Sequence, residues 1–148
     1  MQKENSDIIT IENIEEYSWT IKNGNLVLTK IVPTITEQSL FQHDLRGSKI
    51  IECKINNELV PIDRYYKLLI YLYSKTTKEI ILQKTTLNTS SEKLYVKGFV
   101  YCEKIGLSFQ RADVIKTLKN IINIVKTKTD KFELKILLKN KEIIKFML

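Results

Sequence analysis

Apolar and polar residues alternate along much of this chain, and the alternating runs come in pairs that flank short turn sequences. The first pair, Tyr17–Lys22 and Asn25–Lys30, flanks Asn23 and Gly24. A type I′ turn needs a positive φ at both central residues, and Asn-Gly adopts this conformation readily. The pattern therefore predicts a β-hairpin.

Two more pairs of alternating runs predict two more hairpins. They cover residues 49–55 and 58–62 around Asn56-Asn57, and residues 132–138 and 142–147 around residues 139–141. Pro61 has no N–H to donate, so it belongs at the frayed exit of its strand. Shorter signals predict a strand over residues 79–84, a loop over 85–91, and one or two strands over 94–109, interrupted near Gly98 and Gly106.

Two segments have the character of helices. Residues 64–75 contain no Gly, Pro or Asn and are apolar on nearly every side. They predict a central core helix, with Asp63 as its N-cap. Residues 111–127 carry apolar side chains at intervals of three and four, which is the helical period, and predict a second helix.

The N-terminal segments are less regular. Residues 1–16 are polar and acidic with scattered isoleucines, and they predict either a loosely ordered lead-in or a short edge element. Residues 36–46 allow two interpretations: a short helix capped by Thr36 and stopped by Gly47, or an ordered loop. No repeat or linker divides the chain, so we expect one α+β domain over residues 1–148, with two main helices packed on antiparallel hairpins.

The composition is that of a soluble globular chain. Of 148 residues, 43% are hydrophobic and 28% charged. The longest apolar run, residues 68–73, is far shorter than the roughly 18 residues of a membrane span. The N-terminus lacks the apolar stretch of a secretory signal. We therefore expect a cytoplasmic protein without a membrane partner.

The sequence offers little for metal or cofactor binding. Cys53 and Cys102 lie in strand-like runs, and we expect them to be reduced, half-buried thiols. His43 is the single histidine, and no Cys or His residues have metal-ligand spacing. We expect neither a metal nor another cofactor.

Charge is divided unevenly along the chain. Residues 1–63 carry six basic and ten acidic side chains, whereas residues 64–148 carry eighteen basic and seven acidic ones. Such asymmetry is typical of a protein with an anionic partner. A second interpretation stays open: the chain is rich in Lys, Ile and Asn and has only three Arg, a bias that an AT-rich genome imposes without any function.

One helix concentrates this positive charge. Lys116, Lys119, Asn123 and Lys126 are spaced three, four and three apart, so they share a face about 15 Å long opposite the apolar stripe. Just before them, Ser108, Gln110 and Arg111 lead into the helix N-terminus, where free N–H groups and the helix dipole favour an anion. We predict that these seven residues bind a nucleic-acid backbone or another anion, although an ordinary solvated helix face would look similar.

Aromatic residues give a second possible contact with nucleic acid. Tyr65, Tyr66, Tyr71 and Tyr73 are interleaved with Arg64, Lys67 and Lys75, as in proteins that stack on unpaired bases. Their density on one predicted helix favours a place in the core instead. Tyr17 and Trp19 of the first hairpin allow the same two interpretations.

The best pattern for an enzyme is nuclease-like. Glu52 and Lys54 lie two apart on one strand, eight residues after Asp44, like a degenerate form of the Asp…Glu-x-Lys arrangement that binds Mg²⁺ in restriction-type nucleases. Glu-x-Lys is frequent in a chain of this composition, however. His43 and Asp44 have no nucleophile motif beside them, and glycine-rich phosphate loops are absent from the sequence. No catalytic residues are therefore predicted.

From residue 50 to residue 138 the order of elements resembles a small α+β module found at the ends of some restriction-endonuclease and phage-defence proteins. The hairpin over residues 49–63, the helix Tyr65–Tyr73 and the polar turn and helix over residues 106–122 carry the resemblance. The Ser-Trp customary before the first helix is replaced here by Asp63-Arg64. The resemblance implies work beside nucleic acid or a nucleic-acid enzyme, without catalysis by the module.

The function expected first is thus a non-catalytic module that contacts a nucleic-acid backbone or a nucleic-acid-processing complex. The alternative is a protein-protein interaction protein: an inhibitor, an adaptor or a homodimer that pairs through exposed hairpin edges. A degenerate Mg²⁺-dependent nuclease is the third hypothesis.

Overall fold

The computed structural model describes residues 17–30 and 32–148, so the predicted lead-in over residues 1–16 lies outside the described part. The chain divides into two compact units, Met1–Pro33 and Thr34–Leu148. The single domain expected over the whole chain stays a prediction. No helix in the described ranges is long and apolar enough to cross a bilayer.

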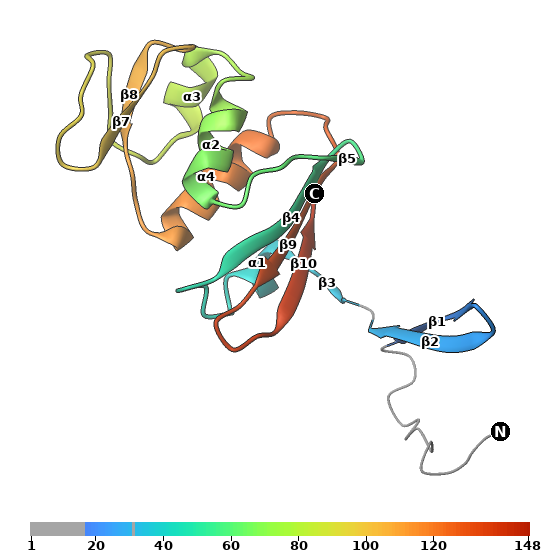
Figure 1. The fold of residues 1–148 in the computed structure, drawn as a ribbon. Helices are drawn as coiled ribbons and strands as arrows, with labels where there is room; N and C mark the ends of the chain where they lie inside the picture. The colour runs from blue at the N-terminus through green and yellow to red at the C-terminus, as the bar shows by residue number, and fades with distance from the viewer. Residues whose placement is uncertain (1–16, 31) are drawn as a thin grey trace. The chain divides into compact units, whose positions relative to one another are not determined.

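The first unit contains the predicted N-terminal hairpin. Strands β1 (Tyr17–Lys22) and β2 (Asn25–Lys30) pair antiparallel, and Lys22 lies opposite Asn25 next to the turn (Figure 1). Asn23 has φ 52° and Gly24 φ 79°, the positive values that a type I′ turn requires. The Asn-Gly prediction is confirmed.

The second unit is built on a five-stranded sheet. Its strands are, in spatial order, β3 (Thr34–Ile35), β10 (Ile143–Met147), β9 (Phe132–Leu137), β4 (Lys49–Ile55) and β5 (Glu58–Leu59). All neighbours are antiparallel except β3, which is parallel to β10. The two hairpins predicted for this part of the chain, β4-β5 and β9-β10, are present. β5 ends before Pro61, because proline has no N–H to donate to a neighbouring strand.

Four helices belong to this unit: α1 (Glu37–Leu40), α2 (Tyr65–Tyr73), α3 (Lys78–Lys84) and α4 (Val114–Val125). For residues 36–46 both interpretations hold in part, because a single helical turn capped by the Thr36 hydroxyl is followed by turns. The two main helices are confirmed.

Two details of the helix predictions are wrong. Residues 79–84 form α3 and not a strand: the Thr77 hydroxyl accepts a hydrogen bond from the N–H of Ile80, and Ile81 is buried. A run of three apolar residues is too short for periodicity to distinguish the two structures. Asp63 does not cap α2, because Arg64 occupies the cap position in an extended conformation and its side chain makes no capping hydrogen bond.

A second, three-stranded sheet has the order β6 (Thr89–Ser90), β8 (Leu107–Gln110), β7 (Phe99–Cys102). The predicted interruptions lie at Gly98 and Gly106, whose φ values are 81° and 63°. The predicted loop over residues 85–91 contains the two-residue strand β6, and is otherwise irregular.

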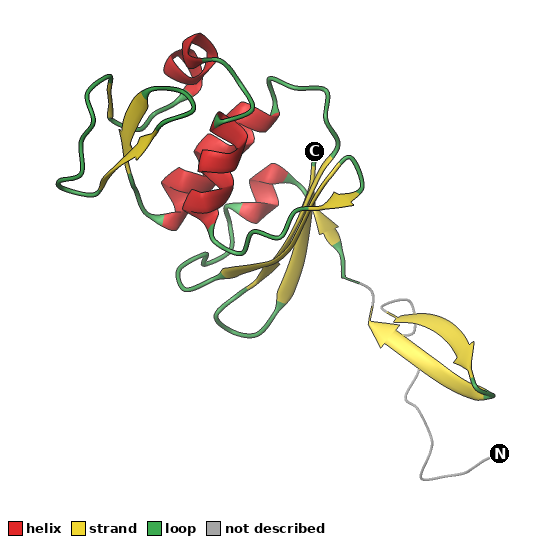
Figure 2. Cartoon of the chain, turned by 45° about the horizontal axis from the view of Figure 1, so that its top comes forward, coloured by secondary structure: helices red, strands yellow, loops and turns green. Residues whose placement is uncertain are grey.

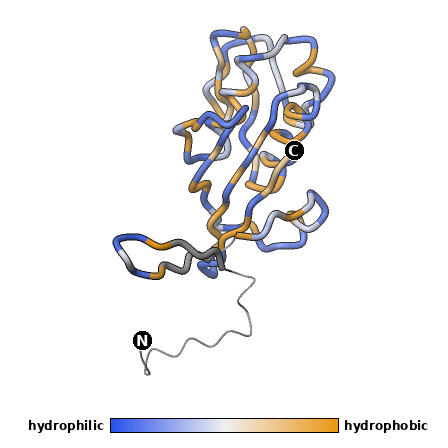
Figure 3. Tube along the Cα trace, turned by 90° about the vertical axis from the view of Figure 1, so that its right-hand side faces the viewer, coloured by the Kyte–Doolittle hydropathy of each residue, from blue (hydrophilic) through white to orange (hydrophobic). Residues whose placement is uncertain are grey.

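The core of the second unit lies between its two sheets. Figures 1 and 2 show α2 and α4 between the five-stranded and three-stranded sheets. Buried side chains from both sheets and from these helices form one apolar cluster. Buried and partly buried side chains alternate along β9, as expected for a strand with one face in the core, and hydrophilic and hydrophobic positions follow one another closely along the trace in Figure 3. The fold is therefore α+β, and Cys53 and Cys102 are buried free thiols within it.

Asn120 of α4 is fully buried and joins three segments by hydrogen bonds. Its Oδ1 accepts from the Thr86 N–H at 2.8 Å and from the Thr85 hydroxyl at 3.2 Å. Its Nδ2 donates to the Lys116 carbonyl and the Thr86 hydroxyl. The Tyr73 hydroxyl of α2 donates to Thr85 at 3.0 Å. This polar network locks α2 and α4 against the segment that follows α3.

Candidate anion-binding site

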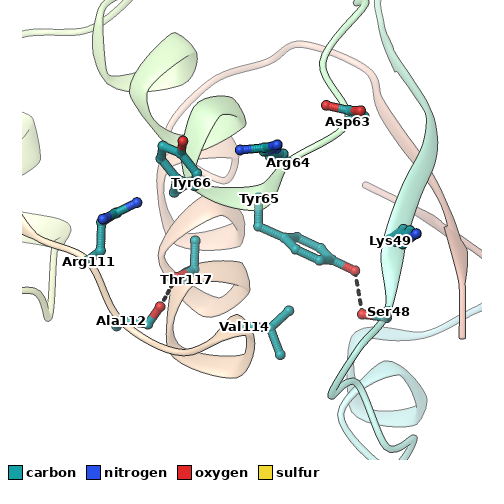
Figure 4. A pocket seen from close by; sticks show the side chains of 10 residues that line it. All are labelled: Ser48, Lys49, Asp63, Arg64, Tyr65, Tyr66, Arg111, Ala112, Val114 and Thr117. Atoms are coloured by element: carbon teal, nitrogen blue, oxygen red, sulfur yellow. Dashed lines mark hydrogen bonds between the residues drawn. The ribbon is translucent and has the colours of Figure 1, made fainter. Parts of the chain in front are cut away.

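A pocket of about 620 Å³ opens where three segments of the second unit meet. Figure 4 shows its walls: Ser48 and Lys49 at the start of β4, residues 63–66 at the start of α2, and Arg111, Ala112, Val114 and Thr117 at the entrance to α4. These segments are far apart in the sequence. The pocket is therefore a product of the tertiary fold.

The pocket has a positive lining. Lys49, Arg64 and Arg111 line it, and Asp63 is the single carboxylate among the described residues of its wall. All four side chains are exposed. Three cations against one carboxylate favour an anionic ligand, and two guanidinium groups can each bind a phosphate or carboxylate through paired N–H bonds.

Arg111 is held over an aromatic ring. Its guanidinium carbon lies 5.0 Å from the centroid of Tyr66, within the range of a cation-π contact (Figure 4). Its backbone N–H donates to the carbonyl of Gly98 at 3.0 Å. Both ends of the residue are thus fixed, and less conformational entropy is lost when a ligand binds.

Tyr65 forms the floor between α2 and β4. Its hydroxyl lies 2.8 Å from the Ser48 hydroxyl, which itself donates to the carbonyl of Leu45 at 2.6 Å. Tyr65 is therefore the donor in the first bond. Burial raises the pKa of Tyr65. The phenol stays neutral and serves to fix the wall.

The two helix N-termini near the pocket differ. The Asp113 carboxylate caps α4 and accepts from the Lys116 N–H at 2.8 Å, so this N-terminus already holds a negative charge. The first turn of α2 lines the pocket, and no side chain within the described residues caps it. Its N–H groups add partial positive charge to the lining. The sequence analysis had instead predicted that the N-terminus of α4 binds the anion.

Of the seven predicted binding residues, only Arg111 lines this pocket. Ser108 is fully buried, and its hydroxyl bonds to the backbone of Glu92 and Leu94. The Gln110 side chain donates to the carbonyl of Lys97 at 2.7 Å and accepts from Asn88 at 2.8 Å. Both polar groups are already used within the fold.

The polar face of α4 is partly engaged by neighbouring helices. Lys119 Nζ lies 5.3 Å from the ring centroid of Phe41, and Lys126 pairs with Glu37 at 2.5 Å. Asn123 and Lys126 line a second pocket of about 470 Å³ beside Lys84 of α3. Lys116 is exposed. The predicted stripe is therefore interrupted by contacts to α1, and it does not join the larger pocket.

The nuclease-like residues do not form a metal site. Glu52 pairs with Lys135 across the sheet at 3.4 Å. Both oxygens of Asp44 accept from Arg46, at 2.9 and 3.0 Å, and this contact lowers the pKa of Asp44 to about 2. Within the described part of the chain no three Asp, Glu, His or Cys side chains lie together as metal ligands do.

Sequence reasoning missed Lys49 and treated Arg64 and Tyr66 only as part of an aromatic cluster. One signal was present in the composition. The chain has three arginines, and two of them line this pocket, while the third is paired with Asp44. A general surplus of lysine does not explain the convergence of the two other arginines.

Comparison with protein-family models, with curated proteins and with solved structures finds no match to this chain.

Proposed function

We propose that this protein is a non-catalytic module that binds the phosphate backbone of a nucleic acid. The observation that carries the proposal is the convergence of Arg64, Arg111 and Lys49 in one pocket with a single carboxylate. The resemblance of residues 50–138 to modules of restriction and phage-defence proteins supports the same class of partner. In this proposal the module works in the cytoplasm, beside nucleic acid or a nucleic-acid enzyme.

The chemistry of the pocket suits phosphate better than base recognition. A guanidinium binds two phosphate oxygens at once, whereas an ammonium acts as a point charge. Most of the affinity then comes from the release of counterions, and it depends little on sequence. Three neutralised phosphates give a slope of log K against log salt of about −2 to −3.

The proposal is tested by fluorescence anisotropy with a labelled duplex and a labelled single strand at low salt. We expect binding that weakens as salt is added and that falls sharply in an Arg64→Gln, Arg111→Gln variant. Arg46→Gln is the matched control, because it removes the third arginine, which lies outside the pocket wall. Undetectable binding by the wild type at low salt would refute the proposal.

A triple variant tests the face of α4 that the sequence suggested. Lys116, Lys119 and Lys126 are changed to Glu. If this variant loses binding while the arginine variant keeps it, the contact surface is α4 and the pocket is not the site.

The second candidate is a homodimer or other protein-protein interaction protein. Ile21 and Leu26 lie opposite each other on the hairpin, and their exposed fractions are 75% and 54%. Two strands alone are marginally stable in water, so we infer that these apolar residues pack against another surface. Light scattering coupled to size exclusion would show a dimer that Ile21→Ser and Leu26→Ser disrupt.

A further inference from the structure

An exposed aromatic side chain stands on a loop that the fold holds in place. Residues 91–98 connect β6 to β7, and within them Tyr95 and Val96 have exposed fractions of 72% and 62%. Tyr95 is thus far more exposed than Tyr65, Tyr66, Tyr71 or Tyr73, which are partly or fully buried. An exposed tyrosine offers a large, amphipathic ring to a partner, and tyrosine is enriched at interfaces for this reason.

The backbone on the N-terminal side of Tyr95 is fixed by Ser108. The fully buried Ser108 hydroxyl donates to the carbonyl of Glu92 at 2.5 Å and accepts from the N–H of Leu94 at 3.0 Å. Glu92 also donates its N–H to the Ser90 hydroxyl at 3.1 Å. The residues that lead to Tyr95 are therefore anchored to β8.

Gln110 and a turn at Lys97 and Gly98 fix the backbone on the C-terminal side of Tyr95. Gln110 donates to the carbonyl of Lys97 at 2.7 Å, and the N–H of Phe99 donates to the carbonyl of Val96 at 3.0 Å. Lys97 has φ 53° and Gly98 φ 81°, which turn the chain back into β7. The backbone is thus anchored before and after Tyr95, while the Tyr95 side chain stays exposed.

The loop is connected to the cationic pocket through adjacent residues. Gln110 holds the loop through its bond to Lys97. The next residue, Arg111, donates its N–H to the carbonyl of Gly98, and its guanidinium lies over the ring of Tyr66 in the pocket. Lys93 and Lys97, two residues before and two residues after Tyr95 in the chain, are exposed, and Lys93 Nζ lies 5.3 Å from the centroid of the Tyr101 ring. One extended ligand with alternating negative and aromatic groups would suit this arrangement.

We infer that Tyr95 stacks on an unpaired base of a strand whose phosphates bind the pocket, so that the protein prefers single-stranded nucleic acid. The inference rests on the proposed function. Bases in a duplex already stack on one another, whereas an unpaired base presents its face to an aromatic ring. A loop fixed before binding loses little entropy on stacking.

The experiment compares labelled oligothymidylate with an abasic oligonucleotide of equal length and with a duplex. The abasic strand keeps the phosphates and lacks the bases, so it isolates the contribution of stacking. Wild type should bind thymidylate about tenfold tighter than the abasic strand, a ratio within the range measured for one base on one aromatic ring.

Three substitutions at one position separate stacking from general hydrophobicity. Tyr95→Ala and Tyr95→Leu should remove the preference for thymidylate over the abasic strand, whereas Tyr95→Phe should keep it. Val96→Ala is the neighbouring control and should leave the preference unchanged. Because Tyr95 is exposed, none of these changes should disturb the fold, and circular dichroism checks this point.

A direct readout comes from Tyr95→Trp. Its added fluorescence should be quenched by thymidylate and unaffected by the abasic strand, with the wild type, which contains Trp19, as background. The stacking inference is overturned if Tyr95→Ala keeps the preference for thymidylate over the abasic strand, or if Tyr95→Leu shows the same preference as Tyr95→Phe. The phosphate proposal is judged separately, by the loss of binding in the Arg64→Gln, Arg111→Gln variant. If the wild type binds none of the three ligands, the proposed function itself fails.

Discussion

The guanidinium of Arg111 lies 5.0 Å from the centroid of the Tyr66 ring, and this contact joins the entrance of α4 to the first turn of α2. Arg111 therefore reaches the pocket in a defined direction before any ligand arrives. Lys49 and Arg64, from two other segments, complete the positive lining. We propose that packing between these elements, which are remote in the sequence, prepares the pocket for an anion.

The Arg111-Tyr66 contact gives the first prediction. Tyr66→Leu should weaken binding of a single-stranded oligonucleotide about two- to fivefold, because a cation-π contact at an exposed site contributes about 0.5–1 kcal/mol. Tyr66→Phe keeps the ring and should bind like the wild type. Anisotropy titrations at fixed salt measure both, and equal affinities for the Leu and Phe variants would show that the ring does not position Arg111.

The two aspartates beside the helix N-termini should behave in opposite ways. Asp113→Ala removes the cap of α4 and should lower the free energy of unfolding by about 1 kcal/mol. Asp63→Ala removes no cap, and should leave stability nearly unchanged while tightening anion binding at low salt, because the pocket loses its carboxylate. Urea unfolding and anisotropy separate the two effects. A stability loss at Asp63 equal to that at Asp113 would contradict the cap assignment.

The buried Asn120 network should be important for stability. Asn120→Leu leaves the Thr86 N–H and the Thr85 and Thr86 hydroxyls without their partner, which should cost about 2–4 kcal/mol of unfolding free energy. Asn123→Leu on the same helix is the control, because the hydrogen bond from the Asn123 side chain to the Lys84 carbonyl is long, at 3.4 Å. A change within about 0.5 kcal/mol is expected there. Similar losses at both positions would contradict the role of the network.

The buried thiol of Cys53 predicts a dependence of stability on alkaline pH. Burial raises the pKa of Cys53 from its ordinary value of 9.0 to about 11. The folded state therefore keeps the proton that the unfolded state loses above pH 9, so the stabilisation is complete below pH 9 and is lost as the pH rises toward 11. Urea unfolding between pH 8 and pH 11 should show this decline, and Cys53→Val should show less of it. Identical pH profiles would remove Cys53 as the cause.

Local signals in the sequence predicted most of the fold. Asn23-Gly24 and Asn56-Asn57 require positive φ values, and the structure has them at all four residues. A nearly continuous apolar run without Gly, Pro or Asn located α2, and apolar residues at intervals of three and four located α4. Residues 79–84 were assigned wrongly because their short apolar run fits a strand and a helix equally well, and the cap at Thr77 decides for the helix.

The site was harder to predict because it is made by tertiary contacts. Arg111 was identified from its place before a helix, but Lys49 and Arg64 meet it only after β4 and α2 have packed. Ser108 and Gln110 were predicted to bind the anion together with Arg111. They hold the loop over residues 91–98 instead and do not line the pocket. Charge spacing along one helix could not reveal a site that three segments share.

The most direct test of the central claim is the salt dependence of binding in the wild type and in the Arg64→Gln, Arg111→Gln variant. The wild-type slope of log K against log salt should be about −2 to −3, and the variant should lose about two from its magnitude, because each arginine neutralises one phosphate. A variant whose slope and affinity equal those of the wild type would contradict the assignment of this pocket as the phosphate site.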